Sequence, residues 1–281
     1  MNKYVISALA TDFDETITKK DTINPLVRLA IAQSDQLHNR LRDWLALSQW
    51  YQAHCSVDIN SFFCNFSSLE DFTIHYHDTV EMAALRKVIS QRFLIGLKKI
   101  QLRQLGQQTP KKPLAEQVLA KLRANSVRIE ILSANWSTDL IIGAMEGLCD
   151  RVTANDLLFD NQKPATTTGE IQLKVTSAQH KQKRIKWMME TYGKTAYIGD
   201  SITDLLAICT ADIGLLIGNN RMVRQALAHF KIPSIEIKSG QHYLPNIHSG
   251  LVICLQSWSE VDFFLSGTKR PSNHEPSHSS L

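Results

Sequence analysis

Two carboxylates that could do chemistry, Asp12 and Asp14, lie two residues apart in the stretch ATDFDETIT at positions 10–18. The apolar run before them, Tyr4 to Leu9, is rich in Val, Ile and Leu and predicts a buried strand. Ligands of open α/β sheets bind beyond the carboxyl ends of the strands. We therefore expect both carboxylates to reach a ligand, and a divalent cation is a suitable one. The alternative interpretation is an acidic turn that caps the next helix.

A serine follows a second predicted strand, which spans Val127 to Leu132. The hydroxyl of Ser133 and the backbone N–H of Ala134 are groups that can bind a phosphoryl oxygen. The same segment can instead cap the helix predicted to begin near Thr138, and the residues alone favour this capping role.

A basic stretch, HKQKR at positions 180–184, opens a further predicted helix. A lysine at this position can neutralise charge between a carboxylate and a phosphate. Lys181 is the preferred candidate and Lys183 the alternate, because spacing alone does not separate them. A solvated basic helix face is the ordinary interpretation of such a stretch.

A third strand end carries two more carboxylates in the stretch GDSITD at positions 199–204. We expect Gly199 to allow a tight turn. Asp200 and Asp204 are four residues apart, so one helical turn would bring them together. A helix cap or dipole partner explains either aspartate, but a hard cation that prefers oxygen ligands explains the pair.

The elements that position these residues divide the chain into two predicted parts. Residues 19–110 have helical periodicity, and from Asp21 to Leu105 they contain one proline and one glycine. Residues 1–18 and 111–266 alternate strands and helices, which predicts an α/β fold: a Rossmann-like doubly wound parallel sheet with an inserted all-helical cap. Residues 267–281 are rich in Ser, Pro and His and are predicted to be a disordered tail.

Composition is typical of a globular protein: 281 residues, 43% hydrophobic, 21% charged and a net charge of +4. Basic clusters at 111–113 and 180–186 are too short to indicate nucleic-acid binding. The five cysteines form no CxxC pair, which argues against a zinc site or a disulfide framework. No apolar run of about eighteen residues is present. We expect a cytoplasmic or nuclear protein with neither nucleic-acid nor membrane partners; its oligomeric state is undetermined.

Taken together, the four stretches resemble the four ordered motifs of the haloacid dehalogenase-like (HAD) phosphohydrolases. Each follows or precedes a predicted strand as in that family, and the resemblance covers nearly the whole chain up to the tail. The matching positions are Asp12-x-Asp14-x-Thr16, Ser133, Lys181 and Gly199-Asp200-x-x-x-Asp204.

The resemblance implies roles for the carboxylates. Asp12 would be the nucleophile that forms an aspartyl-phosphate, and Asp14 the general acid and base. Mg²⁺ would be bound by the Asp12 carboxylate, the backbone carbonyl of Asp14 and the Asp200 carboxylate, with Asp204 supporting or joining that set.

The resemblance also implies a reaction class. Ser133, Ala134 and Lys181 would bind the phosphoryl oxygens, and an acid at Asp14 is typical of the family's phosphomonoesterases. A helical cap between the first two motifs resembles phosphoserine phosphatase and its relatives, which act on small soluble phosphates. The stretches YIGDSITDL at 197–205 and WSEV at 258–261 resemble uncharacterised fungal members of this group. The predicted activity is Mg²⁺-dependent phosphomonoester hydrolysis. A phosphotransferase or mutase, or a non-catalytic binding protein, remains the alternative, and the substrate is undetermined.

Overall fold

The computed structural model describes residues 5–55, 63–162, 164–237 and 247–266. The predicted disordered tail, 267–281, lies outside the described residues. No helix in the described part of the chain has the length and apolar character needed to cross a membrane.

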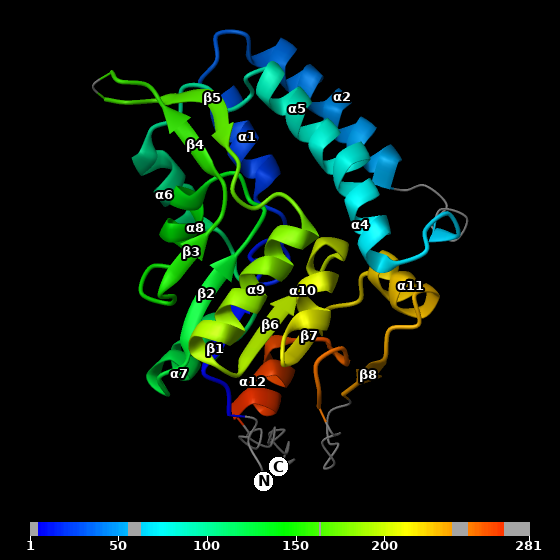
Figure 1. Ribbon diagram of the computed structural model, residues 1–281. Coiled ribbons are helices and arrows are strands. Elements are labelled where there is room, and N and C mark those ends of the chain that lie inside the picture. Colours follow the sequence, from blue (N-terminus) through cyan, green and yellow to red (C-terminus); the bar gives the residue numbers. More distant parts are fainter. Residues whose placement is uncertain (1–4, 56–62, 163, 238–246, 267–281) are drawn as a thin grey trace, which may run out of the picture.

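A seven-stranded sheet forms the centre of the molecule, in the order β3-β2-β1-β6-β7-β9-β8 (Figure 1). Every neighbouring pair of strands in it is parallel. The strands are β1 (Ala8–Thr11), β2 (Arg128–Leu132), β3 (Arg151–Thr153), β6 (Thr195–Gly199), β7 (Ile213–Ile217), β8 (Ser234–Glu236) and β9 (Val252–Leu255). This topology confirms the predicted doubly wound parallel sheet.

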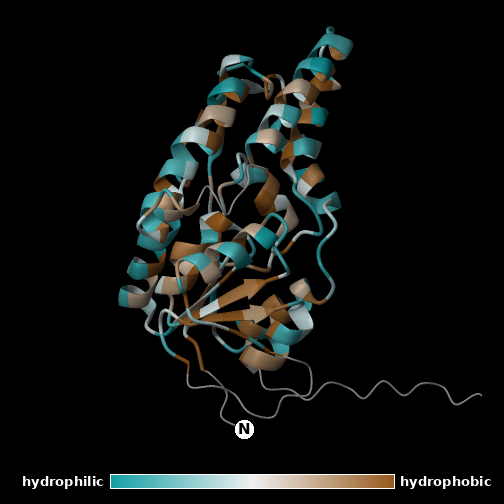
Figure 2. Cartoon of the chain, turned by 90° about the vertical axis from the view of Figure 1, so that its right-hand side faces the viewer, coloured by the Kyte–Doolittle hydropathy of each residue, from teal (hydrophilic) through white to brown (hydrophobic). Residues whose placement is uncertain are grey.

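Helices cover both faces of the sheet because successive side chains of a strand point to opposite sides. In β1, Leu9 belongs to one buried cluster, whereas Ala8 and Ala10 belong to the other. Figure 2 shows the hydrophobic strands between helices banded with hydrophobic and hydrophilic residues. The helices of the α/β part are α7 (Ala115–Ala124), α8 (Thr138–Ala144), α9 (Ala178–Tyr192), α10 (Leu205–Thr210), α11 (Arg221–His229) and α12 (Trp258–Ser266), with the short 3₁₀ turn η2 (Ile202–Asp204).

The segment between the first two motifs is helical in its described residues. It contains α1 (Ile23–Ile31), α2 (Leu37–Cys55), α4 (Leu69–Tyr76), the π-helical turn η1 (His77–Glu81), α5 (Met82–Ser90) and α6 (Lys99–Gln108). The chain leaves and re-enters the sheet domain at Thr18 and Lys111, which pair across an antiparallel bridge. Helices α2, α4 and α5 stand above the carboxyl ends of the strands (Figure 1). We refer to α1, α2, α4, η1 and α5 as the cap.

Helix α6 packs against α8 rather than standing with the other inserted helices (Figure 1). A Cβ atom on Gly106 would lie 2.0 Å from the Leu140 carbonyl oxygen, and one on Gly143 would lie 2.2 Å from the Arg103 oxygen. The two helix backbones therefore meet at glycines. This contact anchors one end of the insertion on the sheet domain.

Several element boundaries differ from those that the sequence predicts. The strand predicted to begin at Tyr4 is found as β1 from Ala8, where pairing with its two neighbours starts; Tyr4 lies outside the described residues. Helix α8 ends at Ala144 and not at Leu148, and Gly147 turns the chain with a φ of 74°. The predicted hairpin is confirmed as the antiparallel pair of β4 (Asp156–Phe159) and β5 (Thr167–Gln172).

Candidate active site

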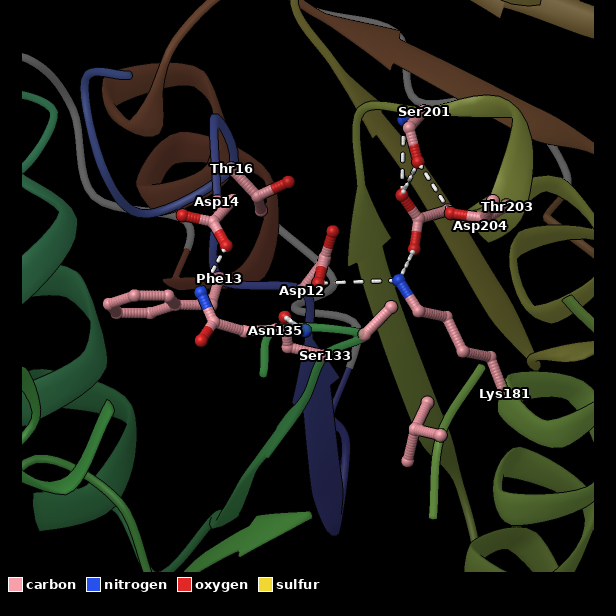
Figure 3. A network of polar contacts seen from close by, with 12 residues as sticks. Asp12, Phe13, Asp14, Thr16, Ser133, Asn135, Lys181, Ser201, Thr203 and Asp204 are labelled. Carbon is pink, nitrogen blue, oxygen red and sulfur yellow. Dashed lines mark hydrogen bonds and ion pairs between the residues drawn. The ribbon is translucent and has the colours of Figure 1, made fainter. Parts of the chain in front are cut away.

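The sheet brings together three of the predicted motifs at the carboxyl ends of adjacent strands. Asp12 directly follows β1, Ser133 follows β2 and Asp200 follows β6, and β1 lies between the other two strands. The order of the strands reverses here, and this is where open α/β sheets bind ligands. Figure 3 shows Asp12 and Ser133 at the ends of separate strands, with the side chains of Lys181 and Asp204 directed toward Asp12.

Three carboxylates form an acidic cluster at this point. One carboxylate oxygen each of Asp12, Asp200 and Asp204 lie within 4.8 Å of one another. Lys181, from the first turn of α9, lies among them with its Nζ 3.3 Å from Asp12 Oδ1 and 2.7 Å from Asp204 Oδ1. The lysine side chain is 1% exposed. Its methylene chain is therefore packed in the core while the ammonium group faces the carboxylates.

Asp204 is the most extensively bonded member of the cluster. Its Oδ1 accepts hydrogen bonds from Lys181 and, at 2.5 Å, from the Tyr197 hydroxyl. Its Oδ2 accepts from the Ser201 hydroxyl at 2.7 Å and from the Ser201 N–H at 3.0 Å. A Cβ atom on Gly199 would lie 2.4 Å from the Asp204 side chain, so the glycine makes room for the carboxylate. The φ of Gly199 is not in the left-handed region, and its expected role in a tight turn stays a prediction.

Asp14 lies in the same loop but is held by a different set of donors. Its Oδ1 accepts from the Thr22 N–H at 2.8 Å and from the Thr22 hydroxyl at 2.7 Å, and its Oδ2 accepts from Asn135 Nδ2 at 2.6 Å. Thr16, two residues further on, donates instead to Asp200 at 2.6 Å. Asp12 and Thr16 of the first motif therefore lie with the acidic cluster, whereas Asp14 between them is directed to Thr22 and Asn135.

Burial and mutual repulsion perturb the pKa values of the carboxyl groups. Burial, followed by the charge of Asp204, raises the pKa of Asp200 to about 8. Burial raises the pKa of Asp12 to about 6 against the opposing charge of Lys181. Burial and the charge of Asp21 raise the pKa of Asp14 to about 7. For Asp204 burial is outweighed, chiefly by Lys181, and its pKa lies below the usual value.

The donor set fits a magnesium ion. Asp12 Oδ1 is buried and accepts no hydrogen bond from the described residues, although it lies next to Lys181. Burial is the chief cause of the raised pKa values of Asp12 and Asp200, and repulsion from the charge of Asp204 adds to both. Carboxylate oxygens are the ligands that Mg²⁺ prefers. A divalent cation among Asp12, Asp200 and Asp204 would relieve this repulsion.

The structure separates the two candidate lysines. Lys181 contacts Asp12 and Asp204, whereas Lys183, two residues later on the helix, is exposed. Ser133 is 2% exposed and close enough to Asp12 for its hydroxyl to lower the pKa of that carboxyl group, against the larger effect of burial. Ala134 is partly buried, and its carbonyl accepts a hydrogen bond from Asn155. Phosphate binding by Ser133 and Ala134 stays a prediction.

Sequence reasoning assigned no role to three residues that organise this site: Thr22, Asn135 and Tyr197. Asn135 is buried and bridges Asp14 and Thr22 through its amide nitrogen. Its position two residues after the motif serine was the available signal, but a helix-capping role explained it equally well. No sequence motif identifies Thr22 or Tyr197 as part of the site, and only their contacts in the structure do so.

Known proteins similar to this chain include one curated relative and several solved structures. No protein-family model matches the chain. One curated relative, the Bifunctional TH2 protein, mitochondrial, from Arabidopsis thaliana, is 26% identical over 304 residues and covers 92% of this chain. The match covers 49% of that protein, so the chain spans about half the length of this relative. Because this relative is a plant protein, the resemblance to fungal members stays a prediction.

Solved structures with the same fold include a phospho-aspartyl intermediate analogue of phosphoserine phosphatase. Its TM-score is 0.55 at 13% sequence identity, over 94% of this chain and 99% of the other. Cytosolic 5'-nucleotidase IIIB bound to cytidine has a TM-score of 0.53 at 13% identity, over 92% of this chain and 83% of the other. With its four motifs assembled at the strand ends, the chain has the fold of the capped haloacid dehalogenase-like hydrolases.

Proposed function

We propose that the protein is a Mg²⁺-dependent phosphomonoester hydrolase that acts on a small phosphorylated metabolite through an aspartyl-phosphate. The observation that carries this proposal is the separation of two aspartates with different environments. Asp12 lies beside Lys181 and two further carboxylates, whereas Asp14 is held apart by Thr22 and Asn135. Such a division is what a nucleophile and a proton donor require.

In the first step a carboxylate oxygen of Asp12 attacks phosphorus, and the bond from phosphorus to the leaving alcohol oxygen breaks. Asp14 gives its proton to that oxygen. A pKa of about 7 leaves a substantial fraction of Asp14 protonated at neutral pH. Lys181 and Ser133 stabilise the negative charge on the phosphoryl oxygens.

In the second step water attacks the phosphorus of the aspartyl-phosphate. Asp14, now a carboxylate, accepts the proton of that water, and the Asp12 carboxylate leaves as inorganic phosphate forms. Thr22 and Asn135 hold Asp14 in one orientation through both steps. The solved phospho-aspartyl analogue of phosphoserine phosphatase supports such an intermediate on this fold.

Asp12, Asp200 and the backbone carbonyl of Asp14 would hold the Mg²⁺ ion, with Asp204 behind them. When bound, the ion supplies charge neutralisation between the nucleophile and the phosphoryl oxygens. The buried hydrogen-bond network of Asp204 keeps that carboxylate ionised and oriented toward the others.

The test is phosphate release from p-nitrophenyl phosphate with Mg²⁺, with EDTA and in the Asp12→Asn variant. We expect Mg²⁺-dependent turnover that EDTA abolishes and Asp12→Asn reduces at least about a thousandfold. Asp35→Asn, an aspartate in the insertion away from the strand ends, is the matched control and should retain activity. Turnover that survives Asp12→Asn would contradict the mechanism. Transfer to an added alcohol in place of water would identify a phosphotransferase.

A further inference from the structure

We propose that Glu81 in the cap selects substrates whose leaving alcohol carries a positive charge, such as an ammonium group. The inference rests on the proposed phosphatase function, because it concerns the part of the substrate beyond the phosphate. Glu81 lies outside the four motifs. Three observations connect it with them: its position in the fold, the surroundings of its carboxylate and the charge of the candidate site.

First, Glu81 lies on the cap segment that faces the start of helix α9. It ends the π-helical turn η1, and His77, four residues earlier, lies 3.2 Å through its Nε2 from the Thr176 hydroxyl. Thr176 precedes α9 by two residues, and Lys181 occupies the first turn of that helix. Burial raises the pKa of Glu81 against the Tyr51 hydrogen bond, the charge of His77 and, more weakly, the charge of Lys181. Short π-helical segments occur frequently at functional sites.

Second, the Glu81 carboxylate is held in an environment that suits a ligand. It is partly buried, and Oε1 accepts a hydrogen bond from the Tyr51 hydroxyl at 2.8 Å. Tyr76, whose hydroxyl is 3.3 Å from Cys55 Sγ, completes the aromatic surroundings. Within the described residues Glu81 forms no salt bridge, while its neighbour His77 pairs with Asp78 at 2.9 Å. A partly buried carboxylate without a cationic partner favours a cationic ligand.

Third, the candidate site has no surplus positive charge that could offset the negative charge of Glu81. The carboxylates at the strand ends outnumber the two lysines whose charges act on them, Lys181 and Lys112. A bound Mg²⁺ ion and the phosphate dianion cancel each other, so the site keeps its negative charge. A cation on the substrate would complement that charge, and a carboxylate there would be repelled. Aromatic rings beside the carboxylate also attract cations.

The experiment compares two phosphate esters of nearly the same shape that differ in charge. Phosphocholine carries a trimethylammonium group, and 3,3-dimethylbutyl phosphate replaces it with a neutral tert-butyl group. Their dissociation constants are measured by calorimetry with Mg²⁺ in the Asp12→Asn protein, which is expected to bind without turnover. We expect phosphocholine to bind at least about tenfold more tightly, and Glu81→Gln to reduce the ratio to within about twofold.

Two further variants separate charge from structure. Glu81→Asp keeps the charge and should retain a preference for phosphocholine. Glu70→Gln removes an exposed carboxylate from α4 and should leave the ratio unchanged. Equal or absent binding of the cationic ester, or a ratio that survives Glu81→Gln, would overturn the proposal. Failure of the proposed function is seen separately, as absence of p-nitrophenyl phosphate turnover in the unmodified protein.

Discussion

The strand ends and the cap hold their carboxylates in different ways. Asp204 and Asp14 accept hydrogen bonds from backbone N–H groups as well as from side chains, and Asp204 also pairs with a buried lysine. Glu81 accepts instead from a side chain, the Tyr51 hydroxyl. Backbone donors move only with the fold, whereas a tyrosine hydroxyl moves with its own side chain. We therefore expect the carboxylates at the strand ends to be held more rigidly than Glu81 in the cap.

The contact between these two regions includes side-chain hydrogen bonds and ring contacts. Gln179 of α9 donates to the Thr73 hydroxyl of α4 at 3.0 Å, and His77 meets Thr176. Phe72 of α4 lies near Phe230, with ring centroids 6.1 Å apart. Contacts of this kind are individually weak. We expect them to hold the cap over the site while permitting it to open.

The largest effect should come from Lys181, the cation of the fixed arrangement. We expect Lys181→Met to reduce turnover at least about a thousandfold, because charge on the phosphoryl oxygens loses its partner. We also expect the free energy of unfolding to fall by about 3 kcal/mol, because buried carboxylates lose their counter-ion. Turnover and urea denaturation measure the two effects. Lys183→Met is the matched control, and a larger effect there would contradict the assignment.

The charge repulsion at the strand ends predicts a pH dependence for the metal-free protein. The pKa of Asp200 is about 8 in the folded state and near 3.8 when unfolded. The folded state thus binds more protons between these values, so stability should fall as pH rises from about 4 to about 8. We expect a loss of about 2 kcal/mol, since partial exposure of the carboxylate screens the charge.

Denaturation in EDTA across this pH range measures that slope. Asp200→Asn removes the carboxyl group with the highest of these pKa values and should reduce the slope, while Asp12 and Asp14 keep the rest of it. Mg²⁺ should restore stability above pH 7. A metal-free protein that is most stable at pH 8 would show that the repulsion is weaker than the geometry indicates.

A smaller effect is expected from Tyr51, which positions Glu81. Tyr51→Phe keeps the ring and removes the hydroxyl that donates to Oε1. The carboxylate then loses its fixed orientation but keeps its charge, so the binding ratio of phosphocholine to its neutral analogue should fall about threefold. The same calorimetry measures this ratio. Tyr192→Phe, at the far end of α9, should not alter it.

The smallest effect compares two glutamines of helix α9 that each donate to a threonine hydroxyl. Gln179 reaches Thr73 in the cap, and Gln182 reaches Thr210 in the sheet domain at 3.1 Å. Each alanine variant should lose about 1 kcal/mol of stability. Only Gln179→Ala should accelerate hydrogen exchange in α4, because its hydrogen bond ties that helix to α9 and the bond of Gln182 does not. Equal exchange in both variants would mean that the Gln179 bond does not restrain the cap.

The sequence alone predicted the parts of this protein that local patterns control. Four motifs at the ends of predicted strands, the helix Ala178–Tyr192 with its bounds, and the hairpin are all present in the structure. These predictions succeeded because hydrophobic periodicity and chain order are properties of neighbouring residues. Strands β3 and β8 were missed because each has three residues and lies at an edge of the sheet, and so short a segment shows no alternation of apolar and polar residues.

Tertiary structure determined the features that depend on contacts between residues far apart in the sequence. Lys181 and Lys183 have the same charge and nearly the same position, and only the packing of α9 buries one and exposes the other. Asn135 and Thr22 lie 113 positions apart and meet on Asp14 because β1 and β2 are neighbours. Glu81 has no motif around it. The turn that it ends meets the start of α9 through the contact of His77 with Thr176, and no local pattern in the sequence encodes that contact.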